Sequence, residues 1–274
     1  MPTLTAPDGT SLVYDAYEPH EPRAALLFVH GWSDHAGRWA GVGARFRDAG
    51  LATYLLDLRG HGRSGGTRAH LSRFSQLLGD LQSLRRAVRL RTEGPQILVG
   101  HGFGGLVVLR YLETQPRDPP ACAIVSSPWL GLSFAAPPAW KLGLARLLGD
   151  LWPTLQMSLP LDAGHLSRDA AVTSAYAGDP LVRRLMTLGA WKEIQWAQRA
   201  VPADGHHIDC PLLFLLAGED RIADASLARA FADGLKTSVE LRWYPEMYHE
   251  VLHDPQSERV FADVLAYLAK LGIA

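Results

Sequence analysis

The chain has 274 residues, of which 47% are hydrophobic and 20% charged, a composition typical of one globular domain with a large buried core. Lysine and arginine number 27 against 28 acidic residues, so no basic excess favours nucleic acid as a partner. The opening MPTLTAPDGT lacks the basic and apolar regions of a signal peptide, and no run of about 18 apolar residues suggests a membrane span. We therefore expect a soluble, cytoplasmic protein that binds a neutral, apolar molecule.

Apolar runs of strand length alternate with helical patterns along most of the chain. After a hairpin predicted from the turn Asp8-Gly9, the predicted strands are 11–18, 24–30, 51–57, 96–100, 121–127, 211–218 and 239–244. Helical patterns cover 36–49, 72–91, 103–114, 224–234 and 255–271. Strands that alternate with helices form a mostly parallel sheet with helices on both faces, and the hairpin brings the expected number of strands to eight.

The alternation is interrupted once. Residues 128–205 contain helical segments separated by proline and glycine, without a convincing strand, and hold five of the eight tryptophans: Trp129, Trp140, Trp152, Trp191 and Trp196. We expect a helical lid here, inserted into a core formed by 1–127 and 206–274. An insertion between strands of an open α/β sheet lies over the carboxyl edge, where such folds bind ligands. The tryptophans form either the lid's own core or an apolar roof over the site.

A glycine-rich turn follows the predicted strand 96–100. The segment 100–105 (GHGFGG) lies between an apolar strand and a helix, which is the context of the nucleophile elbow G-x-S-x-G. Gly102 stands where that motif has serine. A nucleotide-binding turn is the alternative, but no acidic residue ends a second strand at the spacing it needs, and no Gly-Lys-Ser/Thr follows.

Two polar residues follow later strands in the order that an elbow nucleophile requires. Asp220 comes after the strand 211–218, and His249 after the last strand. A histidine base needs a carboxylate that orients its ring toward the nucleophile, so the two placements together predict a catalytic pair.

A competing motif overlaps this pair. His249 also begins the zinc-peptidase pattern H-E-x-x-H, which ends at His253. Asp254-Pro255 follows at once and disfavours the helix that zinc binding needs, so we expect no metal site.

Further motifs lie outside the elbow. They are 30–35 (HGWSDH) with Arg38, 57–64 (DLRGHGRS) and 179–182 (DPLV). They resemble HGxxEHxxRY, D-x-R-G-H-G-x-S and a recurrent lid phrase of the monoacylglycerol lipase and lysophospholipase-like branch of the α/β-hydrolases, and the resemblance covers almost the whole chain. It implies an α/β-hydrolase fold, a serine at position 102, Asp220 as the acid and His249 as the base. It also implies an oxyanion hole made by the backbone N–H groups of Trp32 and Phe103.

Glycine at position 102 removes the hydroxyl that would form an acyl-enzyme. Three histories fit: an engineered inactive variant, a natural protein that binds a ligand without cleaving it, and a natural enzyme that uses histidine and aspartate alone. The intact acid, base and oxyanion segments favour the first. We expect a hydrolase of carboxylic esters with apolar acyl groups, such as monoacylglycerols, which needs no cofactor and is inactive or strongly impaired in this form.

Substrate contacts are expected beside the nucleophile position and from the lid. The candidate residues are His30, Gly31, His101, Trp129, Trp140, Trp191 and Trp196. In addition, the spacing of Trp140, Leu144, Leu147 and Leu148 predicts an apolar helix face. This face either packs on the sheet domain or allows transient contact with a lipid surface.

Overall fold

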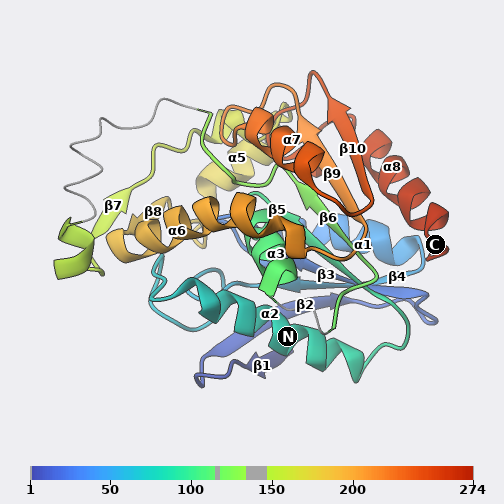
Figure 1. The fold of residues 1–274 in the computed structure, drawn as a ribbon, viewed down its shortest axis with the longest axis horizontal. Coiled ribbons are helices and arrows are strands. Elements are labelled where there is room, and N and C mark those ends of the chain that lie inside the picture. Colours follow the sequence, from blue (N-terminus) through green and yellow to red (C-terminus); the bar gives the residue numbers. More distant parts are fainter. Residues whose placement is uncertain (1, 115–117, 134–146, 274) are drawn as a thin grey trace.

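A computed structural model describes residues 2–114, 118–133 and 147–273. Its main feature is one eight-stranded sheet with the order β1-β2-β4-β3-β5-β6-β9-β10 (Figure 1). The β1–β2 and β2–β4 pairs are antiparallel and all other pairs are parallel, so the expected mostly parallel sheet is confirmed. The strands are β1 (Thr3–Thr5), β2 (Ser11–Tyr17), β3 (Ala24–Val29), β4 (Leu51–Leu56), β5 (Gln96–His101), β6 (Cys122–Ser126), β9 (Leu212–Ala217) and β10 (Val239–Tyr244).

Alternate residues of the central strands enter two different hydrophobic cores, because successive side chains of a strand point to opposite faces. In β3, Ala25, Leu27 and Val29 belong to the core that contains α2 (Phe74–Arg89), α3 (Phe103–Thr114) and α7 (Ala225–Gly234). The intervening residues of β3 belong to the core under α1 (Ala40–Asp48) and α8 (Ser257–Lys270). Helices therefore cover both faces, which explains why these strands are continuous apolar runs.

Strands β6 and β9 are neighbours in the sheet, so the segment that connects them begins and ends at adjacent strands. It contains η2 (Ala163–His165), α5 (Ala170–Gly178), α6 (Leu188–Asp204) and η3 (Gly205–His207), and α6 packs on α3 and α2 (Figure 1). The expectation that it holds no strand is wrong. β7 (Gln156–Ser158) and β8 (Leu185–Thr187) form an antiparallel pair, but three-residue strands are too short to produce a periodic sequence pattern.

The structure differs from the sequence prediction at one further helix. Residues 36–49 were expected as one helix, but a 3₁₀ turn, η1 (Ala36–Trp39), precedes α1. The His35 side chain caps this turn by accepting the N–H of Gly37. Another 3₁₀ turn, η4 (Val251–His253), lies between β10 and α8.

Candidate active site

The turn at Gly102 joins β5 directly to α3, as the elbow motif predicts. Gly102 has φ +54°, in the left-handed region that glycine adopts readily. A Cβ on Gly100 would overlap the carbonyl oxygen of Gly104, and a Cβ on Gly104 would overlap the carbonyl oxygen of Val29. The strand and the helix therefore approach so closely that only glycine fits on either side of position 102.

His249 and Asp220 meet at the carboxyl edge of the sheet. Asp220 lies in the loop after β9 and His249 in the loop after β10, and β9 and β10 are neighbours. The Nδ1 atom of His249 lies 2.9 Å from Oδ2 of Asp220 and 3.1 Å from Oδ1. Asp220 Oδ1 also accepts the backbone N–H groups of Ile222 and Ala223, each at 2.9 Å. These contacts fix the direction of the carboxylate.

The charges of this pair support each other. Burial alone would lower the pKa of His249, but the adjacent Asp220 carboxylate raises it above its ordinary value. Burial alone would raise the pKa of Asp220, but His249 and the two N–H donors lower it. Because a carboxylate only accepts, Nδ1 of His249 carries the proton of this bond, and Nε2 of the neutral ring is left as a base.

The free nitrogen of His249 faces the elbow. A Cβ built on Gly102 would lie 3.1 Å from Nε2 of His249 and 3.8 Å from Cα of Gly31. A hydroxyl carried on that carbon would lie beside Nε2. Position 102 therefore stands where a side-chain nucleophile and this base would meet.

Two backbone N–H groups lie beside position 102. Phe103 is the first residue of α3, and Trp32 follows Gly31. Neither N–H donates to an acceptor within the part of the chain that the structure describes. The helix N-terminus adds a partial positive charge at Phe103, so this corner of the site suits an oxygen that gains negative charge.

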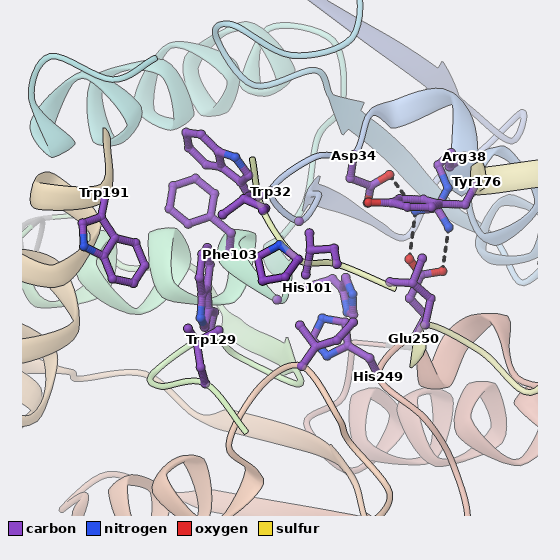
Figure 2. Close-up of a pocket in the computed structure, with 18 of the residues that line it drawn as sticks. Trp32, Asp34, Arg38, His101, Phe103, Trp129, Tyr176, Trp191, His249 and Glu250 are labelled. Carbon is purple, nitrogen blue, oxygen red and sulfur yellow. Dashed lines mark hydrogen bonds and ion pairs between the residues drawn. The ribbon is translucent and has the colours of Figure 1, made fainter. Parts of the chain in front are cut away.

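A cavity of about 290 Å³ opens over these groups. In Figure 2, the aromatic rings of Trp129, Phe103 and Trp191 lie on one side of His101 and His249. Most of the lining is apolar, and residues from 128–205 supply much of it. The further lining residues from that segment are Leu132, Met157, Leu159, Pro160, Leu161, Leu166 and Tyr176.

The opposite end of the cavity is an ion cluster, which we call the Arg38 cluster: Arg38, Asp34, Glu250 and Tyr176 (Figure 2). Arg38 donates to Asp34 Oδ1 and to both oxygens of Glu250, each bond measuring 2.8 Å. The ring of Tyr176 lies 4.7 Å from the guanidinium carbon. Burial would raise the pKa of both carboxyls, but Arg38 holds the pKa of Asp34 below its usual range and that of Glu250 well below it.

Comparison with known proteins identifies the family. The model of a protein family described as serine aminopeptidase, S33, matches residues 20–256. The chain belongs to this α/β-hydrolase family. The family is one of carboxylic ester hydrolases, and the chain is close to monoacylglycerol lipases.

Individual relatives match nearly the whole length of this chain. Monoacylglycerol lipase of Mycolicibacterium smegmatis is 33% identical over 264 residues, which is 95% of this chain and 93% of the relative. Human monoglyceride lipase is 26% identical and covers 92% of this chain and 84% of its own. The crystal structure of Paleococcus ferrophilus monoacylglycerol lipase superposes with a TM-score of 0.84 at 27% identity, over 96% of this chain and 99% of that one.

Four of the expected substrate contacts line the cavity: Gly31, His101, Trp129 and Trp191. The His101 ring lies edge-on to the His249 ring at 4.6 Å. Burial and the neighbouring His249 lower the pKa of His101 to about 3, so the His101 ring is uncharged next to the base.

Of the other three expected contacts, His30 and Trp196 do not line the cavity, and Trp140 stays untested. His30 is fully buried and does not line the cavity; its Nδ1 donates to Gly31 O at 2.7 Å and its Nε2 accepts the N–H of Leu58. Trp196 is 47% exposed and lies over Arg110, outside the cavity lining. Trp140 lies outside the described residues.

The H-E-x-x-H segment of this chain is not the helix of a zinc peptidase. Residues Val251–His253 form a single 3₁₀ turn, and Nδ1 of His249 is used by Asp220. His253 donates to Glu250 Oε2 at 2.7 Å and stacks on Trp39. In residues 2–114, 118–133 and 147–273 no three side chains of metal-ligating type gather closely enough to hold an ion.

The sequence did not indicate that Tyr176 and Glu250 belong to the site. Asp34 and Arg38 were recognised only as members of a motif. One signal was available for Glu250, since it directly follows the candidate base. A carboxylate there must lie near the cavity, and it needs a cation if it is buried.

Proposed function

We propose that this site binds and cleaves carboxylic esters with apolar acyl groups, monoacylglycerols or similar lipids being the leading class, and that position 102 is its nucleophile position. The observation that carries the proposal is the 3.1 Å separation between Nε2 of His249 and a Cβ placed on Gly102. The names of the relatives, among them monoacylglycerol and monoglyceride lipases, support the substrate class.

Each residue has a distinct role in this proposal. Asp220 holds the His249 ring in the tautomer that leaves Nε2 free, and stabilises the ring once it becomes charged. His249 takes the proton of the attacking hydroxyl and later gives it to the departing alcohol. The N–H groups of Trp32 and Phe103 bind the oxyanion that forms when the ester carbonyl is attacked.

With glycine at position 102 the ordinary acyl-enzyme does not form, because its ester oxygen comes from the missing side chain. This chain is therefore strongly impaired in the reaction that its site suits. The geometry of the base, its carboxylate and the N–H donors does not depend on that hydroxyl.

We also propose that residues 128–205 act as a lid. Leu132, Met157 and Trp191 from this segment line the cavity, and the carbonyl of Leu166 accepts the N–H of Glu250, next to the base. An acyl chain would lie among these apolar side chains, and the Arg38 cluster would face the more polar alcohol portion.

The same segment carries exposed apolar side chains that suit transient contact with a lipid surface. Leu147, Leu151 and Trp152 are between 58% and 59% exposed. Of the helix face predicted from sequence, Trp140 and Leu144 lie outside the described residues. Across the described ranges no helix is long and apolar enough to span a bilayer.

The variant Trp152→Ser tests the proposed lipid contact. It should sediment less with phosphatidylcholine vesicles than the unmodified chain; unchanged sedimentation would argue against this contact.

The test of the proposed function restores the hydroxyl. The Gly102→Ser variant should hydrolyse a monoacylglycerol and long-chain p-nitrophenyl esters several orders of magnitude faster than the unmodified chain. The same variant combined with His249→Ala should lose that gain. A folded Gly102→Ser variant that stays inert on all of these esters would refute the proposal.

Gly102 itself favours one alternative, a ligand-binding protein on the hydrolase fold. Such a protein would bind a small apolar molecule tightly, and its affinity would not fall when His249 is replaced.

A further inference from the structure

Among the described lining residues, no hydroxyl, thiol or carboxylate replaces the missing nucleophile. The described lining residues include no serine, threonine or cysteine, and the one hydroxyl belongs to Tyr176. Burial and the nearby Asp34 carboxylate raise the pKa of Tyr176, so it does not ionise near neutrality. Both carboxylates of the lining, Asp34 and Glu250, bind Arg38. No hydroxyl, thiol or carboxylate of the described lining is free to attack, so an oxygen nucleophile for this site is expected to come from outside these residues.

The surroundings of Gly102 fit a small hydroxylic molecule. Outside the adjoining residues, the three heavy atoms nearest to a Cβ there would be Nε2 and Cε1 of His249, at 3.1 and 3.7 Å, and Cα of Gly31, at 3.8 Å. The room that a serine side chain would occupy is thus bounded by a lone-pair nitrogen. In the proposed function the ester carbonyl binds toward the N–H donors of Trp32 and Phe103, which both line the cavity. A water or a very short alcohol has the size and the O–H donor to use this room.

We propose that this chain cleaves esters in one displacement, by attack of a water molecule or a one-carbon alcohol held over Gly102, with His249 as general base. The inference rests on the proposed function of the site and adds the identity of the nucleophile. It also predicts that no acyl-enzyme forms.

The steps balance without any further reactant. The O–H proton passes to Nε2 of His249 as the oxygen bonds to the ester carbonyl carbon, and the carbonyl electron pair moves to the oxyanion held by Trp32 and Phe103. The bond to the leaving oxygen then breaks, and that oxygen takes the proton back from Nε2. Water gives a carboxylic acid and an alcohol, and methanol gives a methyl ester and an alcohol.

The first experiment measures hydrolysis of a p-nitrophenyl ester by the unmodified chain after treatment with a serine-directed phosphonate, which removes contaminating serine hydrolases. Binding and the oxyanion donors alone give about 10³–10⁴-fold acceleration over water, so we expect turnover of at least that order above buffer. The progress curve should show no burst, and added methanol should yield methyl ester. Turnover at the buffer level would overturn the inference.

Two variants test where the nucleophile binds. Gly102→Ala places a methyl group against Nε2 of His249, and His249→Ala removes the base; each should lower turnover at least tenfold. His206→Ala, on an exposed turn away from the cavity, is the matched control and should leave turnover unchanged. Equal turnover in Gly102→Ala and the unmodified chain, or in His249→Ala and the unmodified chain, would contradict the inference.

Gly102→Ser keeps this test separate from that of the proposed function. It carries the same backbone strain at φ +54° as Gly102→Ala, so strain alone does not explain opposite effects of the two variants. If Gly102→Ser is active and the unmodified chain is inert, the inference fails and the proposed function stands. If both are inert while folded, the proposed function fails as well.

Discussion

Removal of Arg38 should destabilise the protein through the two carboxylates that it neutralises. The Arg38 side chain is 8% exposed, and those of Asp34 and Glu250 are 4% and 2% exposed. Arg38→Leu keeps an apolar side chain in this place but removes the guanidinium. It leaves Asp34 with N–H donors from Trp39 and His35, and Glu250 with His253.

The size of the effect follows from burial. Breaking a buried ion pair by removing one partner costs about 3–5 kcal/mol, because the other charge is left without compensation. For a chain of this size, 1 kcal/mol shifts the melting temperature by about 2–4 °C, so we expect a fall of roughly 6–20 °C at pH 7. A matched control is Arg89→Leu: Arg89 is 56% exposed and pairs with the half-exposed Asp118, so its loss should cost less than about 1 kcal/mol.

The loss of stability in Arg38→Leu should depend on pH. In the unmodified protein the pKa values of Asp34 and Glu250 lie below their ordinary values, so their contribution to stability is present at neutral pH and is lost only on strong acidification. In Arg38→Leu the same buried carboxyls are expected to protonate more readily. The destabilisation should therefore shrink between pH 7 and pH 5.

Thermal unfolding followed by circular dichroism, at both pH values and for both variants, measures these differences. A fall no larger than that of Arg89→Leu, or one that does not change with pH, would show that Arg38 does not stabilise these two carboxylates.

Three further predictions concern the site and its support. In the Gly102→Ser background, kcat/KM should rise with pH through the pKa of His249, because only the neutral ring accepts a proton. Adding Asp220→Asn should lower that pKa and reduce kcat by about 10⁴-fold in a pH–rate profile; an unshifted profile would contradict this. Trp191→Ala in the same background should lower kcat/KM about 10–100-fold for long acyl chains and little for acetate esters, and an equal loss on both would count against an acyl-binding role. Gly104→Ala should cost about 3 kcal/mol or more in urea unfolding, because its Cβ overlaps the carbonyl oxygen of Val29, whereas Gly178→Ala, with open space around its Cβ, should be nearly neutral. Equal stability of these two variants would contradict the close approach of α3 to the sheet.

Much of the sheet and of the His249–Asp220 pair could be predicted because the signals are local. Buried parallel strands are continuous apolar runs, and α3 (Phe103–Thr114) begins and ends at the predicted residues. Asp220 and His249 each follow a strand, and the carboxyl ends of neighbouring parallel strands meet at one edge. Their contact therefore followed from topology alone.

The Arg38 cluster was harder to predict, because Arg38 and Glu250 are 212 residues apart and meet only through the packing of two loops. The tryptophans of α6 illustrate a second limit. Trp191 and Trp196 are five residues apart, which places them about 140° apart around the helix, so only Trp191 faces the cavity. The sequence does not show which face of α6 packs toward the sheet, so it does not indicate which of the two tryptophans lines the cavity.

The proposed function depends on a serine-hydrolase site assembled around position 102. Its most direct test is intact-protein mass spectrometry of the Gly102→Ser variant after exposure to a long-chain alkyl fluorophosphonate, which reacts preferentially with a hydroxyl activated by a base beside oxyanion donors. We expect one adduct per chain, located at position 102, and none in the unmodified chain or when His249→Ala is added. A folded Gly102→Ser variant that takes up no phosphonate, or takes it up equally without His249, would contradict it.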